Sequence, residues 1–276
     1  WIWPCDCSSG TATSLRSEGV SDLPADLPAD LCEALAAAAT RPHLLITSDF
    51  DGTLSPIVSN PGDARPLPAA GRALAALAEL PSTAVALISG RALRDLRILS
   101  ALPDAVHLVG SHGAEFDSGF AHDIDQGLLN TITETLEAIA SGRPGVTVET
   151  KPASVALHVR NASPADGEAA LAAAWEAADS WDAHATTGKA VLEFAVISTD
   201  KGEAIDILRD RRRAATVVFF GDDVTDEKAF RRLADGDIGV KVGPGETLAG
   251  YRVDSPEHVA AALSFLLEAR RGMRFA

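Results

Sequence analysis

The fold of this chain is decided by one stretch of sequence, Leu44-Leu-Ile-Thr-Ser-Asp-Phe-Asp-Gly-Thr-Leu54, in which an apolar run passes directly into two carboxylates and a glycine. Leu44 to Ile46 are apolar at successive positions, as in a strand that is covered on both faces. Open α/β sheets place their active sites at the carboxyl ends of such strands. The stretch therefore predicts that Asp49 and Asp51 lie at a site edge, with Gly52 allowing a sharp turn after them.

Strand-like runs and helical patterns alternate on both sides of this stretch. The expected strands cover residues 43–50, 83–89, 106–111, 216–220 and 238–242. Helical patterns cover residues 68–80 and 92–102 and also follow each of the last two strands. This alternation predicts an α/β fold, a Rossmann-like parallel sheet with helices on both faces that is built from two separated stretches of chain.

The segment between the two stretches has a pattern of its own. It is expected to hold two helices and four strands, over residues 125–140, 164–178, 146–149, 155–159, 184–186 and 191–196. An insertion of this length is too long for a loop. We therefore expect a second, smaller α/β unit over one edge of the parallel sheet.

The first 40 residues differ from the rest of the chain. The tandem repeats Leu23-Pro-Ala-Asp and Leu27-Pro-Ala-Asp place prolines too close together for a helix interior, so we expect a mobile leader that ends in a short Ala-rich helix over residues 31–40. The three cysteines, Cys5, Cys7 and Cys32, indicate no disulfide framework. A C-x-C pair with no nearby histidine is also a weak sign of a metal site.

The composition excludes several classes of partner. The chain has 276 residues, 46% of them hydrophobic, which is typical of a globular protein. Its net charge of −15 creates a field that repels nucleic acid and anionic membrane surfaces. We find no apolar run long enough for a transmembrane helix and no signal-peptide pattern at the start. We expect a cytoplasmic protein, with a monomer as the working assumption.

A second acidic motif, Gly221-Asp-Asp-Val-Thr-Asp-Glu227, follows another apolar run. Four acids this close together repel one another unless a cation neutralises them, and oxygen ligands without histidine or cysteine favour Mg²⁺ over zinc. A solvated helix N-terminus would explain Asp226 and Glu227 but not Asp222 and Asp223, which come directly after the strand. The motif therefore predicts a Mg²⁺ site.

Two more polar groups lie where neighbouring strands end or a helix begins. Ser89 ends one expected strand, and Lys201 begins the helix that follows the insertion. Both suit a phosphoryl group. Each alone has an ordinary explanation, since Ser89 could be a helix cap and Lys201 a solvated lysine in a first turn.

Taken together, these residues resemble the four motifs of the haloacid dehalogenase-type phosphatases: Asp49-x-Asp51-Gly-Thr, Ser89, Lys201 and Gly221-Asp222-x-x-x-Asp226. A closer resemblance is to the trehalose-6-phosphate phosphatase family, and it extends over roughly residues 43–265. It rests on further motifs, which are Ile88-Ser-Gly-Arg91, Gly110-Ser-His-Gly-Ala-Glu115, Lys151-Pro-Ala-Ser-Val-Ala-Leu-His158, Gly188-Lys-Ala-Val-Leu-Glu193, Asp200-Lys-Gly202 and Gly239-Val-Lys-Val-Gly243.

The resemblance implies a catalytic set. Asp49 would be the nucleophile that forms an aspartyl-phosphate, and Asp51 would be the acid and base. Ser89 and Lys201 would hold the phosphoryl oxygens. The implied reaction hydrolyses trehalose 6-phosphate to trehalose and phosphate, a step of trehalose biosynthesis.

The resemblance also implies Mg²⁺ as the cofactor. Its ligands would be the Asp49 carboxylate, the Asp51 backbone carbonyl and Asp222, with Asp226 orienting the site. Asp223 could be a ligand, a supporting group or a helix cap.

By the same resemblance, residues 41–116 and 198–276 form the catalytic core, and residues 117–197 form a cap that recognises a small-molecule substrate. The expected substrate contacts are Arg91, Ser111, His112, Glu115, Lys151, His158, Lys189 and Glu193. The alternative for the histidines is simple exposure to solvent. The alternative for Lys151, Lys189 and Glu193 is that they are solvated charges at strand edges.

Two other functions stay open at this point. One is another sugar-phosphate phosphatase of the same superfamily, acting on a sucrose phosphate or a monosaccharide phosphate. The other is an inactive regulatory subunit of a trehalose-phosphate synthase complex. The intact set of Asp49, Asp51, Lys201 and Asp222 argues against the inactive subunit.

Overall fold

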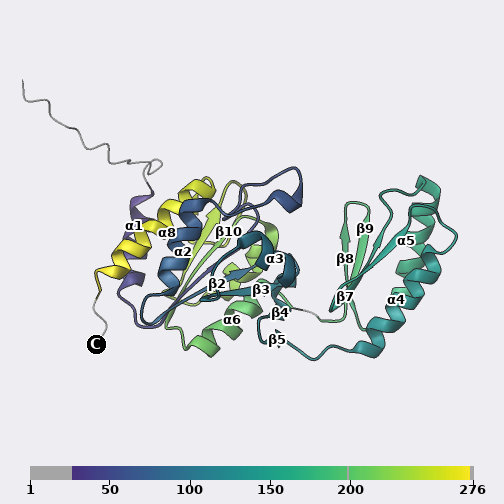
Figure 1. The fold of residues 1–276 in the computed structure, drawn as a ribbon, viewed down its shortest axis with the longest axis horizontal. Coiled ribbons are helices and arrows are strands. Elements are labelled where there is room, and N and C mark those ends of the chain that lie inside the picture. The colour runs from purple at the N-terminus through teal and green to yellow at the C-terminus, as the bar shows by residue number, and fades with distance from the viewer. Residues whose placement is uncertain (1–26, 198, 274–276) are drawn as a thin grey trace, which may run out of the picture.

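The computed structural model describes residues 27–197 and 199–273 and contains a large sheet of eight strands in the order β12-β11-β10-β1-β2-β3-β4-β5 (Figure 1). The strands are β1 (Leu44–Ser48), β2 (Thr83–Ile88), β3 (Val106–Gly110), β4 (Glu115–Phe116), β5 (Gly119–Phe120), β10 (Thr216–Gly221), β11 (Ile238–Val242) and β12 (Tyr251–Val253). All pairs from β12 to β3 are parallel, and β4 and β5 add an antiparallel edge. The parallel sheet built from two separated stretches is confirmed, because β1 lies between β2 and β10.

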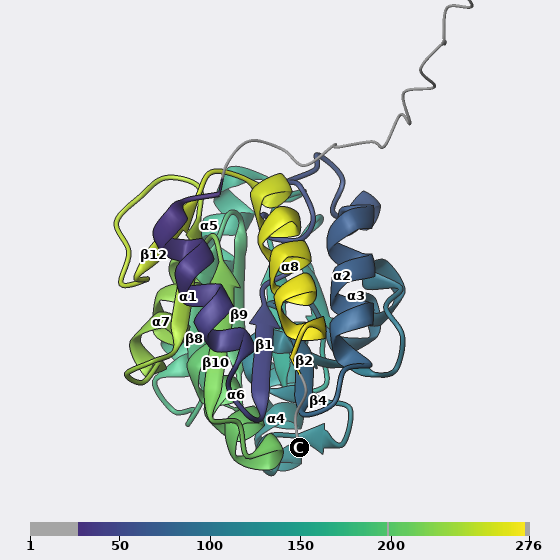
Figure 2. The same ribbon diagram turned by 90° about the vertical axis from the view of Figure 1, so that its left-hand side faces the viewer.

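Helices cover both faces of this sheet, as its apolar runs predict. Leu44 and Ile46 pack on one face and Leu45 on the other, and all three are fully buried. The first face is covered by α1 (Ala29–Ala39), α2 (Pro68–Ala78), α3 (Leu93–Ser100) and α8 (Pro256–Arg271). Figure 2 shows α8 between α1 and α2 on this face. The second face is covered by α6 (Lys201–Arg212) and α7 (Glu227–Arg232). Three short 3₁₀ helices complete the unit: η1 (Pro61–Asp63), η2 (Ser111–Gly113) and η3 (Val224–Asp226).

The insertion forms a second sheet of four antiparallel strands in the order β6-β7-β9-β8. Its elements are α4 (Gln126–Ala140), β6 (Thr147–Thr150), β7 (Ser154–His158), α5 (Pro164–Ala178), β8 (His184–Gly188) and β9 (Val191–Ala195). Leu192 and Phe194 pack with the two helices on one face. The other face is directed toward the large sheet, with α4 and α5 on the outside (Figure 1).

The structure differs from the sequence predictions in a few places. The helix that was grouped with the leader packs into the larger unit, because Leu31 and Leu35 of α1 are fully buried beside α8. The two-residue strands β4 and β5 and the three-residue β12 were not predicted, since they are too short to show a periodicity. The tandem-proline repeat through residue 26, with Cys5 and Cys7, lies outside the described residues. Among the described helices, none has the length and hydropathy that a membrane span requires.

A buried arginine attaches the last helix to the sheet. Arg270 of α8 is 1% exposed, and its guanidinium donates to the backbone carbonyls of Ala39 and Ser82 and to the Thr83 hydroxyl at 2.8, 2.8 and 3.0 Å. These acceptors belong to the end of α1 and the start of β2. One side chain therefore connects α8, α1 and the amino edge of the sheet.

We predict that Arg270→Met lowers the free energy of unfolding by about 2–4 kcal/mol, because it leaves buried carbonyl oxygens without donors. Arg271→Met is the matched control, since Arg271 is exposed and its ion pair among the described residues is with Glu268 on its own helix. Urea unfolding should be followed by far-UV circular dichroism. Tryptophan fluorescence would report mainly on the smaller unit, because the two described tryptophans, Trp175 and Trp181, lie there. Equal midpoints for the two variants would contradict the assigned role of Arg270.

Candidate active site

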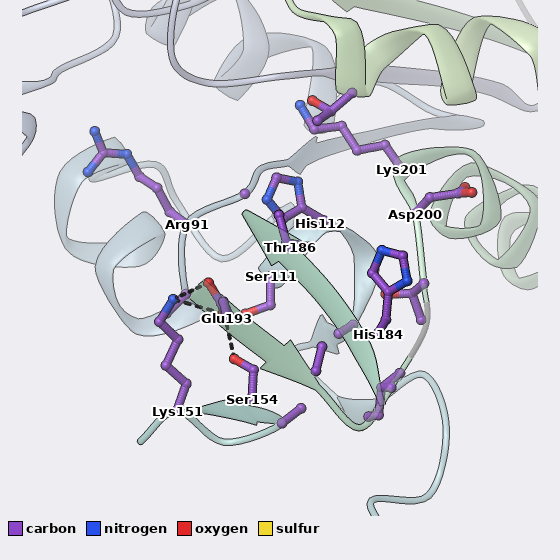
Figure 3. A pocket seen from close by; sticks show the side chains of 18 of the residues that line it. Arg91, Ser111, His112, Lys151, Ser154, His184, Thr186, Glu193, Asp200 and Lys201 are labelled. Atoms are coloured by element: carbon purple, nitrogen blue, oxygen red, sulfur yellow. Dashed lines mark hydrogen bonds and ion pairs between the residues drawn. The ribbon is translucent and has the colours of Figure 1, made fainter. Parts of the chain in front are cut away.

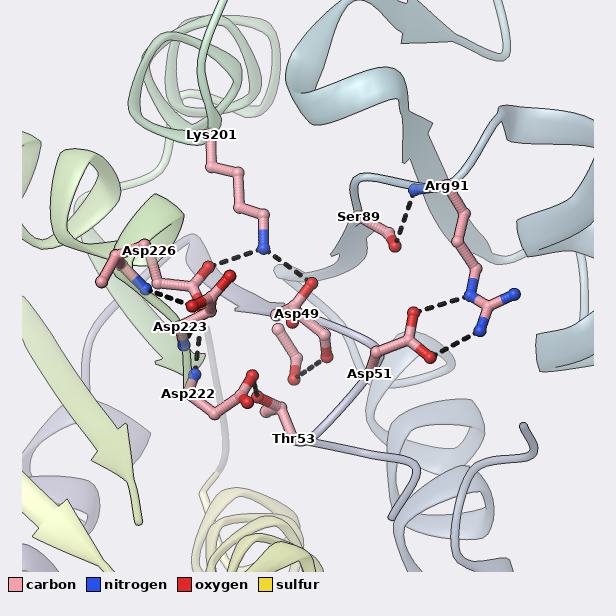
Figure 4. A network of polar contacts seen from close by, with 11 residues as sticks. Asp49, Asp51, Thr53, Ser89, Arg91, Lys201, Asp222, Asp223 and Asp226 are labelled. Atoms are coloured by element: carbon pink, nitrogen blue, oxygen red, sulfur yellow. Dashed lines mark hydrogen bonds and ion pairs between the residues drawn. The ribbon is translucent and has the colours of Figure 1, made fainter. Parts of the chain in front are cut away.

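Two carboxylates lie at the carboxyl edge of the large sheet, directly after β1. The Asp49 amide donates to the Phe220 carbonyl of β10 at 2.9 Å, which fixes Asp49 at the strand end. The chain then turns sharply, since the Gly52 amide donates to the Ser55 carbonyl at 2.8 Å. This local geometry places the Asp49 and Asp51 side chains on the same edge, as the sequence predicted (Figure 4).

Gly52 is needed at this turn for two reasons. Its φ of +79° lies in the left-handed region that favours glycine, and a Cβ here would lie 2.0 Å from Oδ2 of Asp222. The Thr53 hydroxyl then donates to Oδ1 of the same Asp222 at 3.1 Å. The turn after β1 is thus packed directly against the acidic motif that follows β10.

Lys201 joins these two acidic motifs. It is 3% exposed at the first position of α6, and its Nζ lies 2.7 Å from Asp49 Oδ1 and 2.7 Å from Asp226 Oδ1. Burial alone would lower the pKa of Lys201, but the charges of Asp49 and Asp226 outweigh it and raise that pKa. Burial raises the pKa of Asp49 to about 7, against the opposing effect of Lys201. The lysine is therefore a fixed positive charge beneath the edge.

The motif after β10 folds so that its acids have different surroundings. Asp226 is fully buried, and its Oδ2 accepts from the amides of Asp222 and Asp223 at 3.0 and 2.9 Å. The Asp223 carboxylate is exposed and accepts from the Val224 amide as the cap of η3. Asp222 is held against Thr53 at the edge.

Three of these acids form a group with the character of a metal site. Carboxylate oxygens of Asp49, Asp222 and Asp226 lie within 4.8 Å of one another. Burial raises the pKa of Asp222, and the nearby Asp226 charge adds to this effect. Three oxygen donors that repel one another in a buried place suit a hard divalent cation. Neither Asp223 nor the Asp51 side chain belongs to this group.

The Asp51 carboxylate has another partner. Its two oxygens accept from Nε and an Nη of Arg91 at 2.6 and 2.7 Å, a two-point ion pair that the sequence did not predict (Figure 4). Ser89 is buried at the end of β2, and its hydroxyl accepts from the Arg91 amide at 3.2 Å. Ser89 and Arg91 thus lie beside the two aspartates that follow β1.

A cavity of about 530 Å³ opens above this edge and is lined by both units (Figure 3). The larger unit contributes Arg91, Ser111, His112 and Lys201, four of the residues expected from sequence. The smaller unit contributes two more, Lys151 and Glu193. The structure therefore brings six predicted residues to one cavity.

Lys151 and Glu193 form an ion pair on the sheet face that is directed at the cavity. Lys151 Nζ lies 3.0 and 2.9 Å from the two oxygens of Glu193, and the Ser154 hydroxyl donates to Oε1 at 2.6 Å. Partial burial would raise the pKa of Glu193, but the hydrogen bonds from Ser154 and Lys151 outweigh it and lower that pKa. Glu193 is therefore held as a carboxylate that faces the large sheet.

His112 lies between the two units. It has a φ of +56°, and a Cβ on Gly90 would lie 2.5 Å from its ring, so Gly90 is needed for this close packing. Burial lowers the pKa of His112, and Lys201 lowers it further. The imidazole is therefore kept neutral at the cavity wall.

Three predicted substrate contacts do not line the cavity. Glu115 is buried, and its carboxylate accepts from the Leu93 amide at 2.6 Å, where α3 begins. His158 pairs with Glu149 at 2.8 Å, and Lys189 lies in the exposed turn between β8 and β9. These assignments stay predictions.

Sequence reasoning missed several residues that line the cavity, namely Glu149, Ser154, His184, Thr186 and Asp200. One signal could have found two of them. Leu192 and Phe194 are buried against the helices, so alternation puts Glu193 on the opposite face of β9. The two residues that this signal finds are Thr186 and Ser154. Thr186 lies beside Glu193 in the register of the sheet and Ser154 lies beside Ala195, so both are on the same face as Glu193.

Comparison with known proteins agrees with this geometry. A structure of the trehalose-6-phosphate phosphatase of Aspergillus fumigatus is similar, with a TM-score of 0.65 and 26% identity over 86% of this chain and 97% of that one. The fold is thus that of the haloacid dehalogenase phosphatases. The sequence profile described as trehalose-phosphatase matches residues 47–257, and the chain belongs to that family.

The alignments with relatives cover different shares of the relatives' own length. The trehalose-phosphate phosphatase of Mycobacterium avium is 37% identical over an alignment that covers 79% of this chain and 60% of that protein. The trehalose-6-phosphate phosphatase of Escherichia coli is 34% identical over an alignment that covers 82% of this chain and 87% of that protein. The chain therefore spans 60% of the length of its mycobacterial relative.

We predict that Gly52→Ala weakens binding of Mg²⁺ by about tenfold or more, because the new methyl group must displace the Asp222 carboxylate. Gly142→Ala is the matched control: its φ is +74°, and no atom lies within 4 Å of the added Cβ. Both variants should lose about 1–2 kcal/mol of stability from the left-handed backbone. Titration calorimetry should separate them, and equal affinity for Mg²⁺ would contradict the contact between the turn and Asp222.

Proposed function

We propose that this chain is a Mg²⁺-dependent phosphoric monoester hydrolase that converts trehalose 6-phosphate to trehalose and phosphate, as the names of its relatives suggest. The observation that supports it most is the position of Asp49. This carboxylate lies between Lys201 and the acids of the second motif, and its partner Lys201 lines a cavity with a polar wall. An inactive subunit would not need this arrangement.

Asp49 is the proposed nucleophile. A bond forms between its carboxylate oxygen and phosphorus while the bond from phosphorus to the sugar oxygen breaks, and the leaving oxygen takes a proton from Asp51. In the second step a water oxygen bonds to phosphorus, the Asp49 oxygen leaves, and Asp51 takes the proton of that water. Both residues return to their starting state.

We infer that Asp49, the Asp51 backbone carbonyl, Asp222 and Asp226 would hold Mg²⁺. The three carboxylates fit this cation by donor type and spacing. When bound, the ion supplies positive charge that offsets the repulsion between the carboxylates and a phosphate. The exposed Asp223 serves as the cap of η3.

Ser89 and Lys201 are proposed to bind phosphoryl oxygens. Both are buried at the carboxyl edge, where a hydroxyl and an ammonium can stabilise the charge that develops during transfer. Lys201 has a second task, since it holds Asp49 in place at 2.7 Å. Lys201 can contact both a phosphoryl oxygen and Asp49 because the first turn of α6 holds it in a fixed position.

Substrate recognition is assigned to the polar face of the smaller unit together with the loop after β3. Lys151, Glu193, Ser111 and His112 line the cavity there and can bond to sugar hydroxyls. In this proposal residues 117–197 act as the cap over a core of residues 41–116 and 198–276. Cytoplasmic location stays a prediction from the sequence, and a monomeric state stays a working assumption.

The proposal is tested by measuring phosphate release from a panel of sugar phosphates, with Mg²⁺ and with EDTA. Trehalose 6-phosphate should be hydrolysed fastest, activity should be lost in EDTA and restored by Mg²⁺, and Asp49→Asn should retain less than about a hundredth of kcat. The substitution Asp223→Asn is the matched control, because it changes an exposed acid of the neighbouring motif. Equal hydrolysis of glucose 6-phosphate or sucrose phosphate would overturn the substrate assignment.

The role of the cap is tested with Glu193→Ala. A buried polar partner left unpaired costs about 1–3 kcal/mol, so kcat/KM for trehalose 6-phosphate should fall about tenfold or more. Hydrolysis of p-nitrophenyl phosphate should barely change, because this substrate has no sugar to contact the cap. Glu176→Ala, on the exposed side of α5, is the control. An equal loss on both substrates would mean that Glu193 supports the fold instead of binding sugar.

A further inference from the structure

The ion pair between Arg91 and Asp51 has a geometry that ordinary surface pairs lack. The planar guanidinium takes both carboxylate oxygens, at 2.6 and 2.7 Å, and thereby fixes the plane of the carboxylate as well as its position. The two side chains are only 18% and 35% exposed. We propose that Arg91 is a positioning residue for the reaction, which acts by orienting the Asp51 carboxylate. This inference rests on the proposed function, in which Asp51 is the acid and base.

Arg91 is itself held on three sides. Its amide donates to the Ser89 hydroxyl at 3.2 Å, and its carbonyl accepts from the Ser111 amide at 2.7 Å. Its guanidinium carbon lies 5.6 Å from the centre of the Phe50 ring, within the range of a cation–π contact. The arginine is thus anchored to the ends of β2 and β3 and to the residue between the two aspartates. A side chain fixed in this way can hold the Asp51 carboxylate in a defined orientation.

Asp51 depends on such a partner. It lies directly before the turn at the left-handed Gly52 and outside strand β1, which ends at Ser48. In the part of the chain that the structure describes, no ion pair joins the Asp51 carboxylate to Lys201, and Asp51 lies outside the group of Asp49, Asp222 and Asp226. Among the described residues, Arg91 is the side chain that forms an ion pair with Asp51. General acid and base catalysis requires the carboxylate within hydrogen-bond reach of the leaving oxygen, so its orientation decides its efficiency.

The sequence-based alternative is that Arg91 binds the substrate directly, since it also lines the cavity. The two roles predict different kinetics. A direct contact with substrate, when lost, raises KM. Loss of an arginine that acts through Asp51 lowers the rate of the step that needs a proton. The decrease is larger for a leaving group that needs that proton more.

The test uses Arg91→Lys, which keeps a positive charge but cannot form the two-point contact. The substrates are phenyl phosphate and p-nitrophenyl phosphate, which differ little in size, and phenolate is the poorer leaving group. Release of the phenol in the first turnover reports the phosphorylation step. We expect a loss of about 30-fold or more for phenyl phosphate, a loss below about threefold for p-nitrophenyl phosphate, and KM within about threefold of wild type for both.

Two controls complete the design. Arg94→Lys changes an exposed arginine one turn further along, on α3, and should leave both rates unchanged. In an Asp51→Asn background, adding Arg91→Lys should change the phenyl phosphate rate by less than about threefold, because the residue through which Arg91 acts is already lost.

The inference is overturned by a raised KM with unchanged kcat, by an equal loss on both aryl phosphates, or by additive losses in the Asp51→Asn background. Arg91→Gln serves as a second variant, and loss of folded protein in both variants would make Arg91 a residue of the fold alone. If wild type releases phosphate from no sugar or aryl phosphate, the proposed function itself fails. Turnover of aryl phosphates with normal rates in Arg91→Lys overturns only the present inference.

Discussion

A buried lysine between two buried carboxylates holds the carboxyl edge of the large sheet together. Lys201 lies 2.7 Å from Asp49 and 2.7 Å from Asp226, and these three residues come from α6, from the end of β1 and from the motif after β10. Removing one member of such a group leaves an uncompensated buried charge, which is far more costly than the loss of a surface ion pair. This contact fixes the two acidic motifs relative to each other.

The cations at the edge are distributed unevenly among the acids. Asp49 and Asp226 share Lys201, and Asp51 has Arg91. The Asp222 carboxylate has no ion pair among the described residues: its side-chain contacts are the neutral hydroxyl of Thr53 and the Asp49 carboxyl group. Lys241 is buried nearby, but it donates to the backbone carbonyl of Asp222 and not to the carboxylate. The shortage of positive charge is therefore concentrated at Asp222, and this distribution is what favours a divalent cation there.

Sequence reasoning reached the parts of this arrangement that follow from continuous patterns. Strands that are apolar at successive positions predict the parallel sheet, and acids directly after such strands predict the edge. The Arg91–Asp51 pair could not be predicted, because it depends on how the loops after β2 and β3 pack, including the left-handed backbone of Ser111 and His112. The same loops decide that Glu115 accepts a hydrogen bond where α3 begins. No periodicity in the sequence encodes such contacts.

The two sheets differ in the polar groups that they can present to a ligand. A parallel sheet covered on both faces exposes polar groups only where its strands end, so the larger unit offers a few residues in fixed positions. The antiparallel sheet of the smaller unit has one face free, and alternation along β7, β8 and β9 places Ser154, Thr186 and Glu193 on it. A substitution on that face leaves the packing of Leu192 and Phe194 against α4 and α5 untouched. The smaller sheet can therefore change the ligand it accepts while the charges around Lys201 stay as they are.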